Sequence, residues 1–203
     1  MGNSIYVSKW NNHYEYFVCN LPDDGDRDLV KISISEEVIA AKAFSGDSSV
    51  KYVSIDNTSI KKIEQSAFEG CRELRILHWN SKYTLETPSA SVQGLEFSQE
   101  KSNFSIDTAT IQKDAFKDCR NLQTVIFPEA KEFIIEKNAF AGCPALRTVI
   151  QLCEIADIAD DAFLSANKDL LTFIVYDESS AERFARENGI RYITIGKKYQ
   201  NNQ

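Results

Sequence analysis

Residues 111–125 read IQKDAFKDCRNLQTV, and residues 135–149 read IEKNAFAGCPALRTV. The two stretches carry Ile, Ala-Phe, Cys, Leu and Val at the same places, 24 residues apart. The Ala-Phe pair occurs five times, and its phenylalanines are separated by 24, 48, 24 and 23 residues: Phe44, Phe68, Phe116, Phe140 and Phe163. Because 48 is twice 24, the spacing predicts a sixth, degenerate unit centred near Val92. Repetition at this period is typical of stacked repeat proteins.

Further apolar columns accompany the phenylalanines at fixed offsets. Five residues before them stand Ile39, Ile63, Ile111, Ile135 and Ile158. Six residues after them stand Val50, Leu74, Leu122 and Leu146, with Leu170 one residue late in the last unit. Nine residues after them stand Val53, Leu77, Val125 and Val149, with Phe173 late by the same shift. A solenoid requires such columns, because each unit buries its apolar side only against its neighbours.

The same alignment predicts the local structure of a unit. Two residues before the phenylalanine stand residues that commonly cap helix N-termini, which indicates a short helical turn: Ser66, Asp114, Asn138 and Asp161. The segments 74–79, 122–127, 146–151 and 170–175 are rich in β-branched residues and roughly alternate, as strands do. We therefore expect an α/β-type repeat solenoid of about six units of 23–24 residues, each a turn followed by one strand of a parallel sheet.

The two ends of the chain carry patterns typical of caps. Ser4 to Val7 and Tyr14 to Val18 flank a polar Asn-Asn turn, which predicts a hairpin over the first unit. Ser179 to Asn188 reads as an amphipathic helix ended by Gly189, and Arg191 to Ile195 as a last strand. The expected regions are an N-terminal cap over 1–35, repeats over 36–176, and a C-terminal cap and tail over 177–203.

The third unit, residues 80–110, departs from the pattern. It has Ser98 and Lys101 where Leu and Val would stand. One interpretation is a loop that bulges from the solenoid and makes contacts of its own, since loops carry much of protein function. The other is sequence drift in a unit that its neighbours support. The sequence leaves both interpretations open.

Composition excludes several classes of function. The 203 residues are 43% hydrophobic, enough to bury a core without metal or disulfide. A net charge of -7 disfavours nucleic acid as a partner, and the apolar stretches are too short for membrane insertion. Residues 1–7 lack the basic and apolar regions of a secretory signal. The compartment stays open: cell surface or secreted if a signal peptide has been removed, otherwise cytoplasmic.

No arrangement of residues predicts catalysis or a bound metal. Cys71, Cys119 and Cys143 share one repeat column with Leu95 and Ala166, which favours core packing over a metal or redox set. Equivalent side chains in adjacent turns point in parallel, which disfavours a disulfide between them. Two other cysteines, Cys19 and Cys153, fall outside the column and stay unassigned.

The remaining candidates for chemistry also fail. The acidic loop from Asp24 would need Gly and Glu where Leu29 and Ser35 stand, so it does not match a calcium loop. The two histidines, His13 and His78, lie in no pattern with a nucleophile. We expect no catalytic residues, no cofactor and no metal.

The pattern Ile-x-x-x-Ala-Phe-x-x-Cys-x-x-Leu-x-x-Val in residues 111–125 and 135–149 resembles the BspA-like leucine-rich-repeat family, found chiefly in bacterial surface proteins. Residues 36–176 carry the resemblance. It implies a right-handed curved solenoid that binds or adheres, with no catalytic residues. The expected partner is a protein of a host or bacterial surface. An intracellular scaffold or regulator is the alternative; an enzyme is less favoured, since it would need a polar cleft of titratable groups.

Two ladders of residues between the buried columns should point out of the sheet. The candidate partner-binding residues on them are Tyr52, His78, Thr124, Ile126, Thr148, Ile150, Thr172 and Ile174. An exposed β-branched apolar strip is typical of a binding patch. Under this interpretation, changing Ile126 and Ile150 to Lys abolishes binding and leaves the fold intact. The alternative is cross-strand packing, or a strip covered from within the chain.

Overall fold

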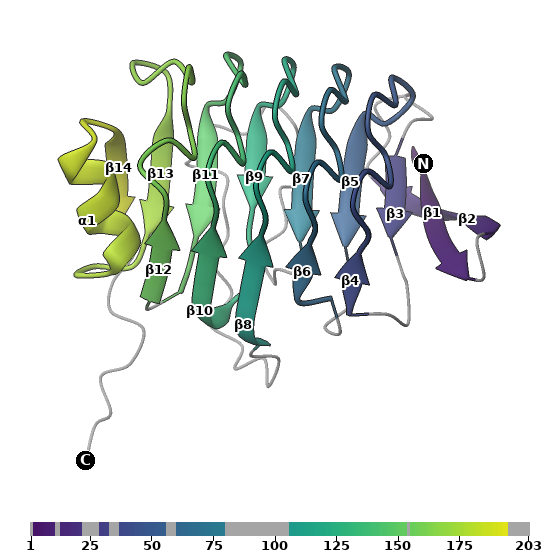
Figure 1. Ribbon diagram of the computed structural model, residues 1–203, viewed down its shortest axis with the longest axis horizontal. Helices are drawn as coiled ribbons and strands as arrows, with labels where there is room; N and C mark the ends of the chain where they lie inside the picture. The colour runs from purple at the N-terminus through teal and green to yellow at the C-terminus, as the bar shows by residue number, and fades with distance from the viewer. Residues whose placement is uncertain are drawn as a thin grey trace.

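The structure, a computed structural model, describes residues 2–10, 13–21, 29–32, 37–55, 60–79, 106–153 and 155–194. In these ranges the chain winds as a flattened coil whose units stack side by side along one axis (Figure 1). The central units each contribute one strand to each of two sheets, and the Ala-Phe turns join the sheets along one edge (Figure 1). The predicted solenoid with a parallel sheet is confirmed.

The larger sheet, here called the long sheet, has nine strands in the order β14-β13-β11-β9-β7-β5-β3-β1-β2. Their bounds are β1 Gly2–Trp10, β2 His13–Leu21, β3 Leu29–Ile32, β5 Tyr52–Ile55, β7 Ile76–Trp79, β9 Thr124–Ile126, β11 Thr148–Gln151, β13 Thr172–Val175 and β14 Arg191–Thr194. The short sheet has five strands in the order β12-β10-β8-β6-β4. Their bounds are β4 Val38–Ile39, β6 Lys62–Ile63, β8 Ile106–Ile111, β10 Ala130–Ile135 and β12 Ile155–Ile158.

Strand register confirms the apolar columns. In the long sheet, parallel pairing aligns Val53, Leu77, Val125, Val149 and Phe173. In the short sheet, it aligns Ile39, Ile63, Ile111, Ile135 and Ile158. The isoleucine column was predicted, but the sheet that it forms was not. Strands of two residues, such as β4 and β6, are too short to show alternation in the sequence.

The second and fourth units are direct neighbours in the stack. Strand β7 pairs directly with β9, and β6 pairs directly with β8. The rings of Phe68 and Phe116 stack with centroids 5.0 Å apart, although 48 residues separate them in sequence. The interpretation of a drifted unit that is stacked between its two neighbours is therefore wrong. Residues 80–105, on which the loop interpretation falls, lie outside the described residues.

Phenylalanine forms a continuous ladder through the core. Centroids of successive rings lie 4.8, 5.0, 5.2 and 5.2 Å apart, at interplanar angles of 8° or less, along Phe44, Phe68, Phe116, Phe140 and Phe163. The three middle rings are fully buried, and the aliphatic columns of both sheets belong to the same core. Each of the three inner rings therefore ties its unit to the units on either side.

The sequence indicated helical turns with N-caps, and the structure shows a different backbone conformation at those positions. Ser66, Asp114 and Asn138 have φ angles of 58°, 58° and 56°, whereas an N-cap residue is extended. These positions need the left-handed region, which Asn and Asp tolerate better than most residues. Lys42, which stands at the same position in the first unit, has the same conformation with a φ of 58°. Asp161 does not have a positive φ.

Hydrogen bonds link each turn to the next. The N–H of Phe116 donates to the carbonyl oxygen of Ala139 at 2.8 Å, and that of Asp118 donates to Ala141 at 2.8 Å. A second set uses the residue four before the phenylalanine. Its side chain accepts from the backbone N–H of the preceding unit: Glu64 from Ala41 at 3.0 Å, Gln112 from Gln65 at 3.2 Å, and Glu136 from Lys113 at 2.8 Å. This recurring Glu or Gln was a signal that the sequence analysis missed.

Two glycines, each two residues after a phenylalanine, provide a matched pair of substitution sites. Gly46 and Gly142 have φ angles of 75° and 72°, which L-residues rarely adopt. A Cβ at Gly46 would meet nothing within 4 Å, whereas a Cβ at Gly142 would overlap the Asp118 carboxylate. We expect Gly46→Ala to lower the free energy of unfolding by about 1 kcal/mol and Gly142→Ala by about 2 to 3 kcal/mol. Urea unfolding measures both losses, and equal losses would show that Asp118 gives way at no cost.

Both predicted caps are confirmed. Strands β1 and β2 form an antiparallel hairpin, and β1 pairs in parallel with β3, so the hairpin extends the long sheet. At the other end, helix α1, Ser180–Glu187, begins after Ser179, whose Oγ accepts from the N–H of Glu182 at 3.2 Å. Gly189 follows with a φ of 66°, and β14 pairs with β13. The domain boundaries at 35/36 and 176/177 stay predictions.

The last unit differs from the predicted register at one point. Leu170, expected in a buried column, is 44% exposed, and Leu171 is fully buried instead. The N–H groups of both Leu170 and Leu171 donate to the carbonyl oxygen of Asn167, so this turn is one residue longer before the strand begins.

Among the described residues, no helix is long and apolar enough to cross a membrane.

Candidate interaction surface

Two ladders run across the long sheet on the face that points away from the main core. Pairing aligns the first as Tyr52, Ile76, Thr124, Thr148 and Thr172. It aligns the second as Ser54, His78, Ile126, Ile150 and Ile174. The structure therefore brings all eight candidate partner-binding residues onto two neighbouring ladders, as the repeat alignment predicted.

Exposure divides the candidates into two groups. Tyr52, His78, Thr124 and Thr148 are partly exposed. Thr172 is almost completely buried, with 8% of its surface exposed. The isoleucines are fully buried, with 0% exposure for each of Ile126, Ile150 and Ile174. The predicted exposed apolar strip is therefore wrong for the isoleucine ladder.

The three isoleucines belong to a second apolar cluster. Ile126, Ile150 and Ile174 pack with Leu152, and the partly buried Tyr176 lies against them, apart from the main core. Of the two interpretations of this strip, packing within the protein holds for the isoleucines. A Lys at Ile126 or Ile150 is then not expected to leave the fold intact, which corrects the earlier expectation for that double variant.

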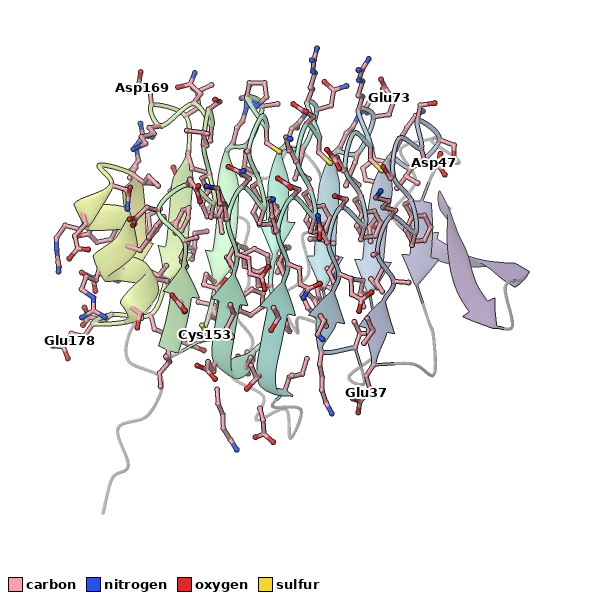
Figure 2. All side chains as sticks on the ribbon, viewed as in Figure 1. Glu37, Asp47, Glu73, Cys153, Asp169 and Glu178 are labelled. Carbon is pink, nitrogen blue, oxygen red and sulfur yellow. The ribbon has the colours of Figure 1, made fainter. Side chains whose placement is uncertain are left out.

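A polar pair lies inside the main core near the other end of these strands. Gln151 occupies a column that is otherwise apolar, and its Nε2 donates to Cys153 Sγ at 2.9 Å. Gln151 Oε1 is buried and has no hydrogen-bond partner. Cys153, which the sequence left unassigned, is fully buried, toward the edge of the slab opposite the turns (Figure 2). Because both groups are buried, this pair is part of the interior and not of the surface.

The cysteine column lies in the core, as predicted, and also donates hydrogen bonds. Each thiol donates to the carbonyl oxygen of a phenylalanine in the preceding unit: Cys71 to Phe44 at 3.0 Å, Cys119 to Phe68 at 3.1 Å, and Cys143 to Phe116 at 3.2 Å. All three cysteines are free. Burial raises the pKa of Cys71 and Cys143 to about 12, and that of Cys119 well above its ordinary value of 9.0. Protonated thiols suit this role, because a thiolate cannot donate.

These pKa shifts predict how stability depends on pH. Well below pH 9 the thiols are protonated in the folded and the unfolded chain, so their contribution is fully present. From pH 9 to 12 the unfolded thiols ionise first, and the free energy of unfolding falls. Replacing Cys71, Cys119 and Cys143 by Ala should make this fall shallower. Urea unfolding on both sides of pH 9 tests it, and parallel pH profiles for the two proteins would contradict it.

A coil of short parallel strands, stacked on buried phenylalanine and aliphatic columns and capped at both ends, defines a repeat solenoid of the leucine-rich type. A family model described as "BspA type Leucine rich repeat region (6 copies)" matches residues 37–170 and 93–201, which together span most of the chain. The chain belongs to this family. Searches of curated proteins and of solved structures found no match. The family match indicates a protein-interaction module, and such folds are typically non-enzymatic.

Proposed function

We propose that this protein binds a protein of a cell surface through the partly exposed residues of the long sheet, without a cofactor. The family match to a protein-interaction repeat carries the proposal. The C-terminal cap supports it, because helix α1 packs against the last strands and leaves the sides of the solenoid to a partner. The same surface would serve an intracellular scaffold, and the identity of the captured protein separates the two roles.

Four residues form the proposed contact surface: Tyr52, His78, Thr124 and Thr148. They lie on successive units of the long sheet, on the face that points away from the core. Threonines on neighbouring rungs give a flat polar surface with hydroxyl donors and acceptors, and the Tyr and His rings extend it toward the N-terminal units. Aromatic residues with a polar end are enriched at interfaces.

The test compares two double variants with the same chemical change. Thr124→Arg with Thr148→Arg alters the proposed face. The control, Thr108→Arg with Thr110→Arg, alters partly exposed threonines on β8 of the short sheet. The immobilised wild type captures proteins from bacterial and host surface extracts, and a captured protein is then purified and titrated against each variant.

We expect the face variant to bind the purified partner at least about tenfold more weakly, because a misfitted long side chain at an interface costs more than 1.4 kcal/mol. The control should bind like the wild type. Equal binding by both variants would place the interface elsewhere. Capture of glycans without any protein would overturn the proposal as a whole.

A further inference from the structure

The edge of the slab where the turns pass into the long sheet differs in charge from the rest of the chain. The net charge of the protein is -7. In four units, the segments that connect the Ala-Phe turn to the strand of the long sheet are residues 48–51, 72–75, 120–123 and 144–147. They contain a single acidic residue, Glu73, and five basic residues: Lys51, Arg72, Arg75, Arg120 and Arg147. In the last unit, 167–171, one basic and one acidic residue balance.

These basic residues lie on neighbouring or alternate units of one edge of the slab. The N–H of Arg75 donates to the carbonyl oxygen of Lys51 at 2.7 Å, and that of Gln123 donates to Arg75 at 2.7 Å. The N–H of Arg147 donates to Gln123 at 2.9 Å. These four residues are therefore successive rungs, about 4.8 Å apart in a parallel sheet. Arg72 and Arg120 stand three residues before Arg75 and Gln123, so they lie on the same two neighbouring units. We call Arg72, Arg120 and Arg147 the arginine edge.

Five lysines among the described residues form ion pairs, and the arginine edge forms none. The lysine pairs are Lys61 with Glu37, Lys113 with Asp114, Lys117 with Glu69, Lys131 with Asp107, and Lys137 with Asp161. Arg72, Arg120 and Arg147 are exposed, and within the ranges that the structure covers none of them has a carboxylate within ion-pair distance. Nitrogen-tipped side chains project past the turns near Glu73 (Figure 2).

We propose that the arginine edge binds an acidic segment of a protein partner. The proposal rests on the proposed protein-binding function and adds a class of ligand to it. Arg72 and Arg120 carry like charges on neighbouring rungs and repel one another, and an anionic ligand removes that cost. Guanidinium groups bind carboxylates in pairs of parallel hydrogen bonds, which lysines cannot do. A protein segment is favoured over other polyanions because the family is one of protein-interaction repeats.

A direct titration tests the edge without knowledge of the natural partner. The probe is a fluorescein-labelled oligoglutamate peptide, followed by fluorescence anisotropy at low and at high salt. The edge variant carries Arg72→Gln, Arg120→Gln and Arg147→Gln. The control variant removes the same charge elsewhere, through Lys42→Gln, Lys62→Gln and Arg183→Gln. Thermal melts establish that both variants fold.

We expect the wild type and the control to bind the peptide at low salt, and the edge variant to bind at least about tenfold more weakly. Added salt should weaken wild-type binding more than binding by the edge variant. Equal affinities for the edge variant and the control would overturn the inference, as would no binding at low salt. Binding of a sulfated oligosaccharide but not of oligoglutamate would overturn the choice of an acidic protein.

The surface-extract experiment separates this inference from the proposed function. If the edge variant retains full affinity for the purified partner while the variant at Thr124 and Thr148 loses it, the arginine edge is not a site for that partner. The protein-binding function then stands without it. If no protein is captured but oligoglutamate binding depends on the edge, the proposed function fails and the charge preference of the edge remains.

Discussion

Replacement of Phe116 by Ala is expected to lower the free energy of unfolding by about 4 kcal/mol, near the upper range for a single core truncation. The ring is fully buried and stacks on Phe68 at 5.0 Å and on Phe140 at 5.2 Å. Its loss leaves a cavity in the middle of the ladder and weakens the contacts of two neighbours at once. Because each unit of a solenoid is stabilised mainly by adjacent units, the loss spreads along the stack. Urea unfolding followed by circular dichroism measures it.

The matched control is Phe44→Ala at the end of the same ladder. Phe44 is partly exposed and stacks on Phe68, with centroids 4.8 Å apart. Its loss should cost about half as much as that of Phe116, since less area leaves contact and one fewer stacked neighbour is affected. If the two variants lose the same free energy, the cost belongs to each ring alone and the ladder does not couple the units.

Ile150→Lys is expected to cost at least about 3 kcal/mol, and the variant should be largely unfolded if the protein has ordinary stability. Ile150 is fully buried between Ile126 and Ile174, and Leu152 completes the cluster. A lysine there buries its ammonium without a counter-charge or loses its charge on folding, and either outcome costs free energy. The midpoint of urea unfolding and the near-ultraviolet circular dichroism spectrum report the loss.

Thr148→Lys, two residues earlier on the same face of β11, is the control. Thr148 is partly exposed, so a lysine can extend its charge into water, and we expect a change within about 0.5 kcal/mol. A small effect for both variants would mean that Ile150 is accessible in solution. That result would restore the exposed apolar strip as a candidate binding patch.

The repeat columns could be predicted because stacked units place equivalent residues in equivalent surroundings. Val125 and Val149 hold the same column in the sequence and pair in the sheet. The C-terminal cap could be predicted for a different reason: the helix after Ser179 has both an N-cap residue and a terminal Gly189. Spacing does not reveal backbone conformation, so the left-handed φ at Asp114 was mistaken for a cap.

The surface was harder to predict than the core. Alternation shows that Ile126 and Ile150 point away from the main core, but it cannot show that they are buried in a second cluster. The direct contact between Phe68 and Phe116 could not be predicted either, because an unbroken period of 24 suggests an unbroken stack. Arg72 and Arg120 share an offset of four residues after the phenylalanine, whereas Arg147 stands seven residues after Phe140, so the repeat alignment does not group the three. Their lack of counter-charges became apparent only from the ion pairs of the other units.

The contact between Phe68 and Phe116 also bears on how the chain folds. Neighbouring phenylalanines are elsewhere 23 or 24 residues apart, whereas this pair closes a loop of 48. Doubling a loop adds only about 0.6 kcal/mol of closure entropy, so the native state is little penalised. Contacts between residues distant in sequence form more slowly, however, and folding of a solenoid spreads from a nucleus to its neighbours. The units from Phe116 onward can therefore form without waiting for those before Phe68, and the joining of the two halves is the natural late step.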